Sequence, residues 1–300
     1  MSNNKNEKAV RPSSRAVRKR SVRIRTAVQL FFFLLIAMIA VNHTLSEGGG
    51  GIPLLSAASL HAVCPFGGVV SIYQLGAVGD FVKQTHESSL VLMIAVFLLA
   101  VAAGPVFCGW ICPFGTFQEF LAKIGRKIFG KRYNTMIPRR IDKPLRYLRY
   151  AVALWVIYVT ARSAQLVFAD YDPYYALFNF WSGEVALTAF IALAAVVVLS
   201  LFIDRPFCKY ACPYGAVLGI FNLFRVFGIR RNAETCIDCK ACDRACPMNI
   251  EVSTSGRVRD HQCISCLKCS SEHVCPVSDT VEMMTGRFPM GEPAAVGEVK

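Results

Sequence analysis

Four long apolar stretches limit what this chain of 300 residues can fold into. They cover residues 26–45, 90–107, 150–168 and 185–203. A helix that crosses a bilayer needs about 20 predominantly apolar residues, and each stretch comes close to that length. A cleaved signal peptide is the alternative for the first stretch, but it lacks a small-residue cleavage site and three more stretches follow it. We therefore predict a mostly α, polytopic membrane protein with about four transmembrane helices.

The basic residues predict how these helices are oriented. The formal net charge is +13, although 54% of the residues are hydrophobic. Lys and Arg are concentrated in residues 1–25 and in the loop between the second and third stretches, while the loops after the first and third stretches contain few. Because positively charged loops stay in the cytoplasm, we expect a multi-pass protein of the cytoplasmic membrane with its N-terminus and everything after residue 203 inside. Topology and contact with anionic lipid explain the basic residues, so no nucleic acid is expected as a partner.

Eight cysteines after residue 232 form the strongest chemical signal. They are spaced CxxCxxCxxxCP and then CxxCxxCxxxxxCP, and they are Cys236, Cys239, Cys242, Cys246, Cys263, Cys266, Cys269 and Cys275. In two-cluster ferredoxins the last cysteine of each run ligates the other cluster. We therefore predict two 4Fe-4S clusters. The first is assigned to Cys236, Cys239, Cys242 and Cys275, and the second to Cys263, Cys266, Cys269 and Cys246.

Two other uses of these cysteines are weaker. A four-cysteine zinc site needs neither the third CxxC-spaced cysteine nor the proline that follows each run. Disulfides are rare in the reducing cytoplasm. The second run departs from the usual spacing, because five residues, Ser270–Val274, separate its last two cysteines. This spacing enlarges the loop beside the first predicted cluster, which takes Cys275 as its fourth ligand.

A second cysteine motif occurs twice, one hundred residues apart. FCGWICPFG contains Cys108 and Cys112, and FCKYACPYG contains Cys208 and Cys212. Since proline suits the first turn of a helix, we expect interfacial helices over residues 114–130 and 214–229, with Cys112 and Cys212 at their N-caps. A helix N-terminus favours a thiolate over a thiol. We predict one composite redox site from the two pairs, either a further iron–sulfur centre or a thiol relay, with packing as small buried hydrophobes as the alternative.

The repeat suggests that the membrane part consists of two related halves. We expect a basic tail over residues 1–25, a membrane domain over 26–232, a small ferredoxin-like α+β domain over 233–284 and a disordered tail over 285–300. Cys64 and His61 precede the first motif, and ordinary burial is the simpler explanation for both. Asp172 and its neighbouring tyrosines could accept quinol protons near the outer face, although anchoring at the interface is the more ordinary role of such aromatic residues.

Four spans, two FCxxxCP motifs and a C-terminal two-cluster ferredoxin segment resemble the NapH family of membrane iron–sulfur proteins, whose relatives include MauN and the polyferredoxin part of NosR. The resemblance implies a quinol dehydrogenase component that passes electrons between the quinone pool and redox protein subunits. Quinone or quinol would be its substrate, and a flavoprotein or ferredoxin its partner. The twelve cysteines of the two motifs and the two runs match the cysteine positions of the family. Cys64 lies outside this pattern.

Two other functions stay open on the sequence alone. One is an assembly or metal-delivery factor for a respiratory enzyme, similar to CcoG, and it would be indicated by a fused outward-facing domain. The other is a membrane thiol–disulfide oxidoreductase, for which CxxC pairs would be expected instead of CxxxCP. The quinol-linked electron-transfer protein is the favoured hypothesis.

Overall fold

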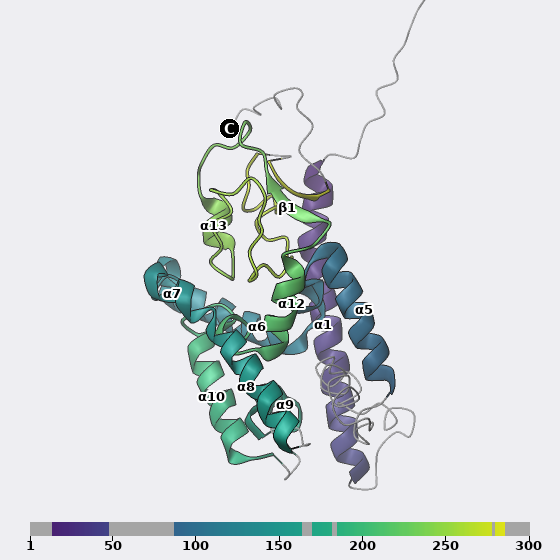
Figure 1. Cartoon of the computed structure of the whole chain (residues 1–300). Helices are drawn as coiled ribbons and strands as arrows, with labels where there is room; N and C mark the ends of the chain where they lie inside the picture. Colours follow the sequence, from purple (N-terminus) through teal and green to yellow (C-terminus); the bar gives the residue numbers. More distant parts are fainter. Residues whose placement is uncertain (1–13, 48–86, 164–169, 182–184, 278–279, 286–300) are drawn as a thin grey trace, which may run out of the picture.

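The computed structural model describes residues 14–47, 87–163, 170–181, 185–277 and 280–285 (Figure 1). In chain order its elements are α1 (Ser14–Glu47), α5 (Glu87–Ala103), the π-helical turn η1 (Phe107–Ile111), α6 (Pro113–Phe129), the 3-10 turn η2 (Gly130–Arg132), α7 (Arg139–Leu145), α8 (Leu148–Ser163), α9 (Pro173–Phe178), α10 (Leu187–Ser200), α11 (Pro206–Tyr210), α12 (Pro213–Asn222), β1 (Gly228–Arg231), α13 (Ala241–Ala245) and β2 (Val281–Met284). Figure 1 shows the smaller unit with β1 and α13 seated at one end of a long helical unit. The described chain is therefore mostly helical, as predicted.

The described parts of the four apolar stretches lie mainly in α1, α5, α8 and α10. Helix α1 begins at Ser14, so the helix extends into the predicted basic tail. By length and composition, one described helix could cross a membrane, the Val22–Asn42 part of α1; the apolar parts of α5 and α10, Val91–Ala103 and Leu187–Ser200, are shorter. The helices are thus confirmed, and the number of membrane spans stays a prediction.

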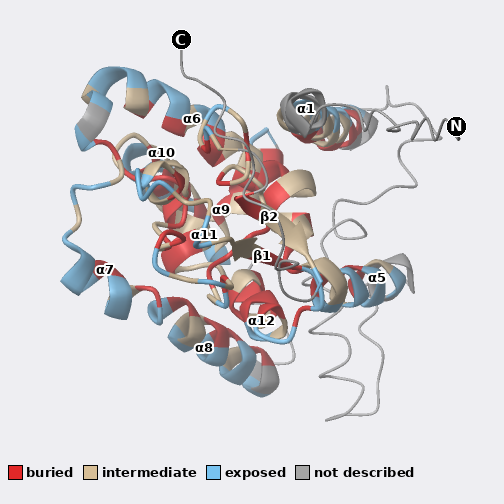
Figure 2. Cartoon of the chain, turned by 90° about the horizontal axis from the view of Figure 1, so that it is seen from above, coloured by how far each residue is buried: buried red, intermediate tan, exposed pale blue. Residues whose placement is uncertain are grey.

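Large apolar side chains cover the outer faces of these helices. Leu30 of α1, Leu98 of α5, Leu154 of α8 and Ile191 of α10 are each more than half exposed. Seen from above, α1, α5 and α8 lie around the edge of the molecule, with their buried residues turned inward (Figure 2). A soluble monomer rarely exposes so many large apolar side chains on neighbouring helices.

Proline starts both helices that follow the cysteine motifs, as the sequence predicts. Pro113 and Pro213 occupy the first turns of α6 and α12, and Cys112 and Cys212 are the N-caps. Helix α6 ends at Phe129, close to the expected position, but α12 ends at Asn222, well before residue 229. The side-chain amide of Asn222 donates to the carbonyls of Asp260 (2.6 Å) and Cys263 (3.0 Å). The chain therefore leaves α12 early and enters the C-terminal unit.

The C-terminal unit is a small α+β structure. Strands β1 and β2 pair antiparallel, with Gly228 opposite Met284 and Arg231 opposite Val281. Ile229, Met248 and Val281 pack in its core together with several cysteines. Because β1 precedes residue 233, the sheet takes one of its strands from the chain before the predicted domain boundary.

Some predictions fall outside the described residues. These are the predictions for Cys64 and His61, and those for the two chain ends, residues 1–13 and 286–300.

The two units meet through a close backbone contact at Gly109 of η1. A Cβ atom at this position would lie 2.3 Å from the carbonyl oxygen of Ile264 and 3.4 Å from the Cα of Cys266. Nearby, the indole N–H of Trp110 donates to the carbonyl of Ser265 (3.1 Å), and the hydroxyl of Ser265 donates to the carbonyl of Ala103 (2.7 Å). Only a residue without a side chain allows this approach.

We expect Gly109→Ala to separate the C-terminal unit from the helical unit without unfolding either. The added methyl group would clash with backbone, which cannot rotate away as a side chain can. Limited proteolysis should cut the loop around residues 255–265 faster in this variant than in the wild type. Gly256→Ala is the matched control, since a Cβ there would meet nothing within 4 Å. Equal cleavage rates in the wild type and Gly109→Ala would contradict this role of Gly109.

Candidate iron–sulfur centres

The first predicted cysteine quartet surrounds one pocket, which we call the outer pocket. Cys236, Cys239, Cys242 and Cys275 line it. The long loop before Cys275 does not displace this residue, because a turn closes it. The Cys275 N–H donates to the carbonyl of Ser271 (2.9 Å), and the Ser271 hydroxyl donates to the carbonyl of Lys268 (2.7 Å). The structure therefore brings Cys275 to the quartet that the sequence assigned to it.

The second predicted quartet surrounds another pocket, which we call the inner pocket. Cys246, Cys263, Cys266 and Cys269 line it. Apolar side chains such as Met248 form most of the remaining wall. Each pocket thus takes three cysteines from one run and one from the other, which is the crossed arrangement expected for two-cluster ferredoxins.

The quartets are spread more widely than a single metal ion requires. Within the described residues, no group of three or more His, Cys, Asp or Glu side chains could hold one metal ion. Zinc would draw four sulfurs to about 2.3 Å from one point. A 4Fe-4S cluster takes four sulfurs that lie farther apart, because each thiolate binds a different iron atom.

The two FCxxxCP motifs face each other across an approximate two-fold axis. The ring of Phe107 meets that of Tyr214 edge to face at 5.9 Å and 86°, and the ring of Phe207 meets that of Phe114 at 5.3 Å and 89°. Positions 107 and 207 are equivalent in the repeat, as are 114 and 214. The backbone repeats as well, because the N–H groups of Cys112 and Cys212 donate to the carbonyls of Phe107 and Phe207 at 2.9 and 2.8 Å. Each motif therefore presents its cysteine pair to the other.

The four motif cysteines form one cluster of thiols, which we call the composite site. Cys108, Cys112 and Cys212 pack around the same buried group, which includes Phe107 and Leu218. Cys208 accepts an N–H bond from the side-chain amide of Gln118 (3.4 Å), and Cys212 accepts one from the backbone of Gly215 (3.3 Å). The motif cysteines also raise one another's pKa, which requires that they lie close together. The predicted juxtaposition of the two pairs is thus present in the structure.

One expectation for the composite site is wrong. The N-cap position of Cys112 and Cys212 was expected to favour the thiolate, but burial raises the pKa of all four thiols, that of Cys112 to about 12. Repulsion between the thiolates adds to burial, and the N–H bonds of the N-cap only partly offset both. Without a bound cation these cysteines are therefore neutral. A coordinated metal deprotonates its thiol ligands outright, so the site suits metal binding better than thiol chemistry.

The composite site and the inner pocket are neighbours. Cys108 packs against the apolar group that contains Cys263 and Cys269. The contacts of Gly109 and Trp110 with residues 264–266 hold the first motif against the loop that supplies two ligands of the inner pocket. The three cysteine sets therefore follow one another in the order composite site, inner pocket, outer pocket.

A buried carboxylate, Glu119 of α6, joins four parts of the chain beside this site. Its side chain forms ion pairs with Arg25 of α1 (2.7 Å), Arg205 (2.8 Å) and Lys268 of the loop between two inner-pocket cysteines (2.7 Å). The three cations hold the pKa of Glu119 well below its usual range, against the effect of burial. Arg205 is fully buried and also donates to the carbonyl of Cys108 (2.5 Å). We call these four residues the Glu119 network.

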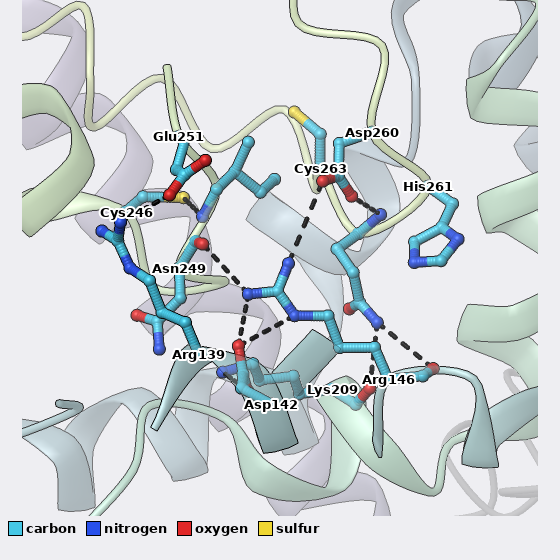
Figure 3. A network of polar contacts seen from close by, with 12 residues as sticks. Arg139, Asp142, Arg146, Lys209, Cys246, Asn249, Glu251, Asp260, His261 and Cys263 are labelled. Carbon is cyan, nitrogen blue, oxygen red and sulfur yellow. Dashed lines mark hydrogen bonds and ion pairs between the residues drawn. The ribbon is translucent and has the colours of Figure 1, made fainter. Parts of the chain in front are cut away.

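A second polar network fastens the C-terminal unit to α7 and α11 (Figure 3). Asp142 of α7 pairs with Arg146 and with the buried amine of Lys209 (2.6 Å), and it accepts a bond from the hydroxyl of Tyr210 (2.5 Å). Arg146 in turn donates to the carbonyl of Asn249 (3.0 Å), which follows Cys246 in the chain. The loop that supplies Cys246 to the inner pocket is therefore held from the helical side.

Sequence reasoning missed the charged residues of both networks. Arg25 and the Arg and Lys residues of 139–149 were attributed to topology alone, yet Arg25, Arg146 and Arg149 are buried. The available signal was Glu119, a lone carboxylate in a basic amphipathic segment whose other charges are Lys and Arg. A charge of opposite sign on such a helix needs a partner, and here it has three.

Comparison with known proteins bears on the two FCxxxCP motifs. A family described as a 4Fe-4S binding domain matches residues 85–132 and again residues 185–232. The first match contains Cys108 and Cys112, and the second contains Cys208 and Cys212. The same family therefore matches both halves of the repeat, and each match includes one cysteine pair of the composite site.

Several curated proteins are similar over most of the chain. The putative electron transport protein YccM of Escherichia coli strain K12 is 31% identical over 237 residues, a match that covers 77% of this chain and 64% of that protein. An uncharacterized protein of Methanocaldococcus jannaschii is 30% identical over 209 residues, which covers 70% of this chain and 82% of that protein. The ferredoxin-type protein NapH of Haemophilus influenzae is 28% identical over 185 residues, with 59% and 62% covered. The chain belongs to the NapH-like family of ferredoxin-type iron–sulfur proteins.

Membership of this NapH-like family establishes iron–sulfur binding and a relation to electron transport. The matches span just under two thirds of the length of YccM and of NapH. No solved structure matches the chain.

Proposed function

We propose that this NapH-like chain is a membrane-bound electron-transfer protein that passes electrons between the quinone pool and cytoplasmic redox partners, as a quinol dehydrogenase component. The observation that carries the proposal is the row of three cysteine sets. The outer and inner pockets would hold one 4Fe-4S cluster each, and the composite site a further iron–sulfur centre. Such centres supply one-electron storage at each position, and the chain supplies their spacing and surroundings.

Exposed apolar surface and charge support a place in the membrane. The outward-facing leucines and isoleucines of α1, α5, α8 and α10 would be favourable in lipid and unfavourable in water. The basic residues around α6 and α7 lie on the side of the C-terminal unit, where anionic cytoplasmic lipids would attract them. The proposal is therefore a membrane-embedded helical unit with four spans, of which those of α5 and α10 are short, and a C-terminal unit in the cytoplasm.

A quinol releases two electrons and two protons when it is oxidised, so a proton acceptor must lie near its site. Asp172 caps α9 by accepting the N–H of Tyr174 (2.9 Å). Burial raises the pKa of Asp172 to about 7, so this carboxyl group could take up a proton near neutral pH. The ring of Tyr174 lies 6.3 Å from that of Phe114, the second residue after Cys112. The start of α9 therefore brings a carboxyl group close to the surroundings of the composite site.

The outer pocket is suited to electron exchange with a redox protein. Cys239 is exposed, whereas Cys263 and Cys269 of the inner pocket are buried. A flavoprotein or a ferredoxin could therefore approach the outer cluster closely, while the inner cluster stays covered. The thiol–disulfide alternative is less well supported, since reactive cysteines need a low pKa and access, and burial raises the pKa of the motif thiols.

Quinol oxidation is tested by anaerobic purification in detergent followed by addition of menaquinol. We expect the broad visible absorbance of the iron–sulfur clusters to bleach, because electrons enter at the composite site and move on to the inner and outer clusters. Dithionite on the same sample is the control that shows how much of the absorbance is reducible. Clusters that dithionite bleaches but that stay oxidised with both menaquinol and ubiquinol would refute the quinol-linked function.

A further inference from the structure

Arg225, just after α12, is a buried cation whose counter-charge is a cluster ligand. Its side chain is 2% exposed, and its guanidinium group donates to the sulfur of Cys263 (3.3 Å), the hydroxyl of Ser265 (3.2 Å) and the carbonyl of Val258. Among the described residues, no carboxylate forms an ion pair with it. A buried charge needs a partner of opposite sign. The Cys263 thiolate of a loaded inner pocket is the partner that the structure offers.

The outer pocket has both signs of charge around it, because Arg231 donates to the sulfur of Cys236 while two carboxylates lie beside the ligand sulfurs. The Cys236 and Cys242 sulfurs each lie 3.7 Å from a carboxylate oxygen, of Asp238 and Asp243 respectively. Arg231 forms an ion pair with Asp238 (3.2 Å), so this carboxylate already neutralises part of the charge of Arg231. The Asp238 side chain is 76% exposed, so solvent screens this group more than it screens Arg225.

Charges near the sulfurs change the reduction potential of a cluster in a known direction. Reduction adds one negative charge, so a cation that donates to a ligand sulfur stabilises the reduced form, and a carboxylate destabilises it. Burial of the inner pocket opposes reduction, because low dielectric disfavours added charge. The same burial strengthens the attraction of Arg225, since the effective dielectric constant is lower there.

We propose that Arg225 is a positioning residue that raises the reduction potential of the inner cluster above that of the outer cluster. An electron on the outer cluster then moves to the inner one, which oxidises the first centre and reduces the second by one electron, with no proton transferred. The inner cluster would therefore be reduced first, and the outer cluster would be reduced only at a lower potential. This inference rests on the assignment of two clusters made under Proposed function, and it does not depend on quinol.

A redox titration of the full chain in detergent, followed by electron paramagnetic resonance, tests this order. Cys239→Ser should remove or alter the outer signal and Cys266→Ser the inner one, which assigns the two signals. In the wild type we expect the inner signal at the higher potential. Arg225→Gln should lower the inner midpoint potential and leave the outer one unchanged, and Arg225→Lys should lower it less, because the charge stays but the forked donor is lost.

Two further variants complete the test. Arg259→Gln removes an equal charge at an exposed position of the same unit, so neither potential should change. Asp238→Asn should raise the midpoint potential of the outer cluster, so the inner and outer potentials should lie closer together. An inner signal below the outer one in the wild type, or an unchanged inner potential in Arg225→Gln, would overturn the proposal. If Arg225→Gln does not assemble its clusters, two other measurements test the proposal. These are the inner midpoint potential of Arg225→Lys and the order of the two potentials in the wild type. If the two potentials have the expected order but quinol does not reduce the clusters, the quinol-linked function is refuted and the role of Arg225 stands.

Discussion

Replacing Cys108 and Cys208 together by Ser should lower the iron content of the purified chain to about eight atoms, from about ten to twelve in the wild type. Two 4Fe-4S clusters in the inner and outer pockets account for about eight irons, and the composite site would hold the rest. The double variant removes one ligand from each half of the two-fold arrangement. Reduction by quinol should stop, because electrons lose their point of entry, while dithionite should still reduce the two remaining clusters. Iron and sulfide analysis on anaerobic samples measures the first effect, and absorbance the second.

The control for this variant adds a hydroxyl group without removing a thiol. Ala211→Ser lies in the second motif, between Cys208 and Cys212, and should keep both the iron content and reduction by quinol. A wild-type count near eight would exclude a metal centre at the composite site and leave a thiol relay. Unchanged reduction by quinol in the double variant would exclude the composite site in either form.

Spacing predicts the cysteine chemistry of this chain because the ligands are local in sequence. Three cysteines of each run lie within seven residues, so one loop brings them together whatever the rest of the fold does. Proline after each motif likewise starts α6 and α12 locally, with no contribution from distant residues. Local patterns of this kind can therefore be predicted from the sequence alone.

Pairs that are distant in sequence leave no such pattern. Arg25 and Glu119 are 94 positions apart, and nothing in the spacing of either residue indicates the other. The early end of α12 depends on Asn222 binding backbone carbonyls of residues 260 and 263, which are also distant in sequence. The thiol pKa values could not be predicted for the same reason, because burial by packed helices outweighs the local effect of an N-cap.

Glu119→Gln should destabilise the chain by about 3–5 kcal/mol, the usual cost of removing one partner from a buried ion pair. Gln can still accept hydrogen bonds, but it leaves Arg25 and Arg205 buried beside each other without a counter-charge. The same substitution should loosen the loop around Lys268, since the ion pair to Glu119 holds that loop against α6.

Chemical denaturation in detergent, followed by circular dichroism, measures the stability difference, with iron loaded equally in both samples. Glu251→Gln is the matched control. This substitution breaks an ion pair in which the Glu251 side chain is 35% exposed and the Arg139 side chain 65% exposed. The free energy of unfolding should therefore fall by about 1 kcal/mol or less. Equal stability of the two variants would show that the Glu119 network contributes no more than a surface pair. In that case the thiolates of the loaded composite site would neutralise the unpaired arginines. The stability difference between Glu119→Gln and Glu251→Gln should then reappear once iron is removed. The reason is that the thiols of the metal-free site are neutral.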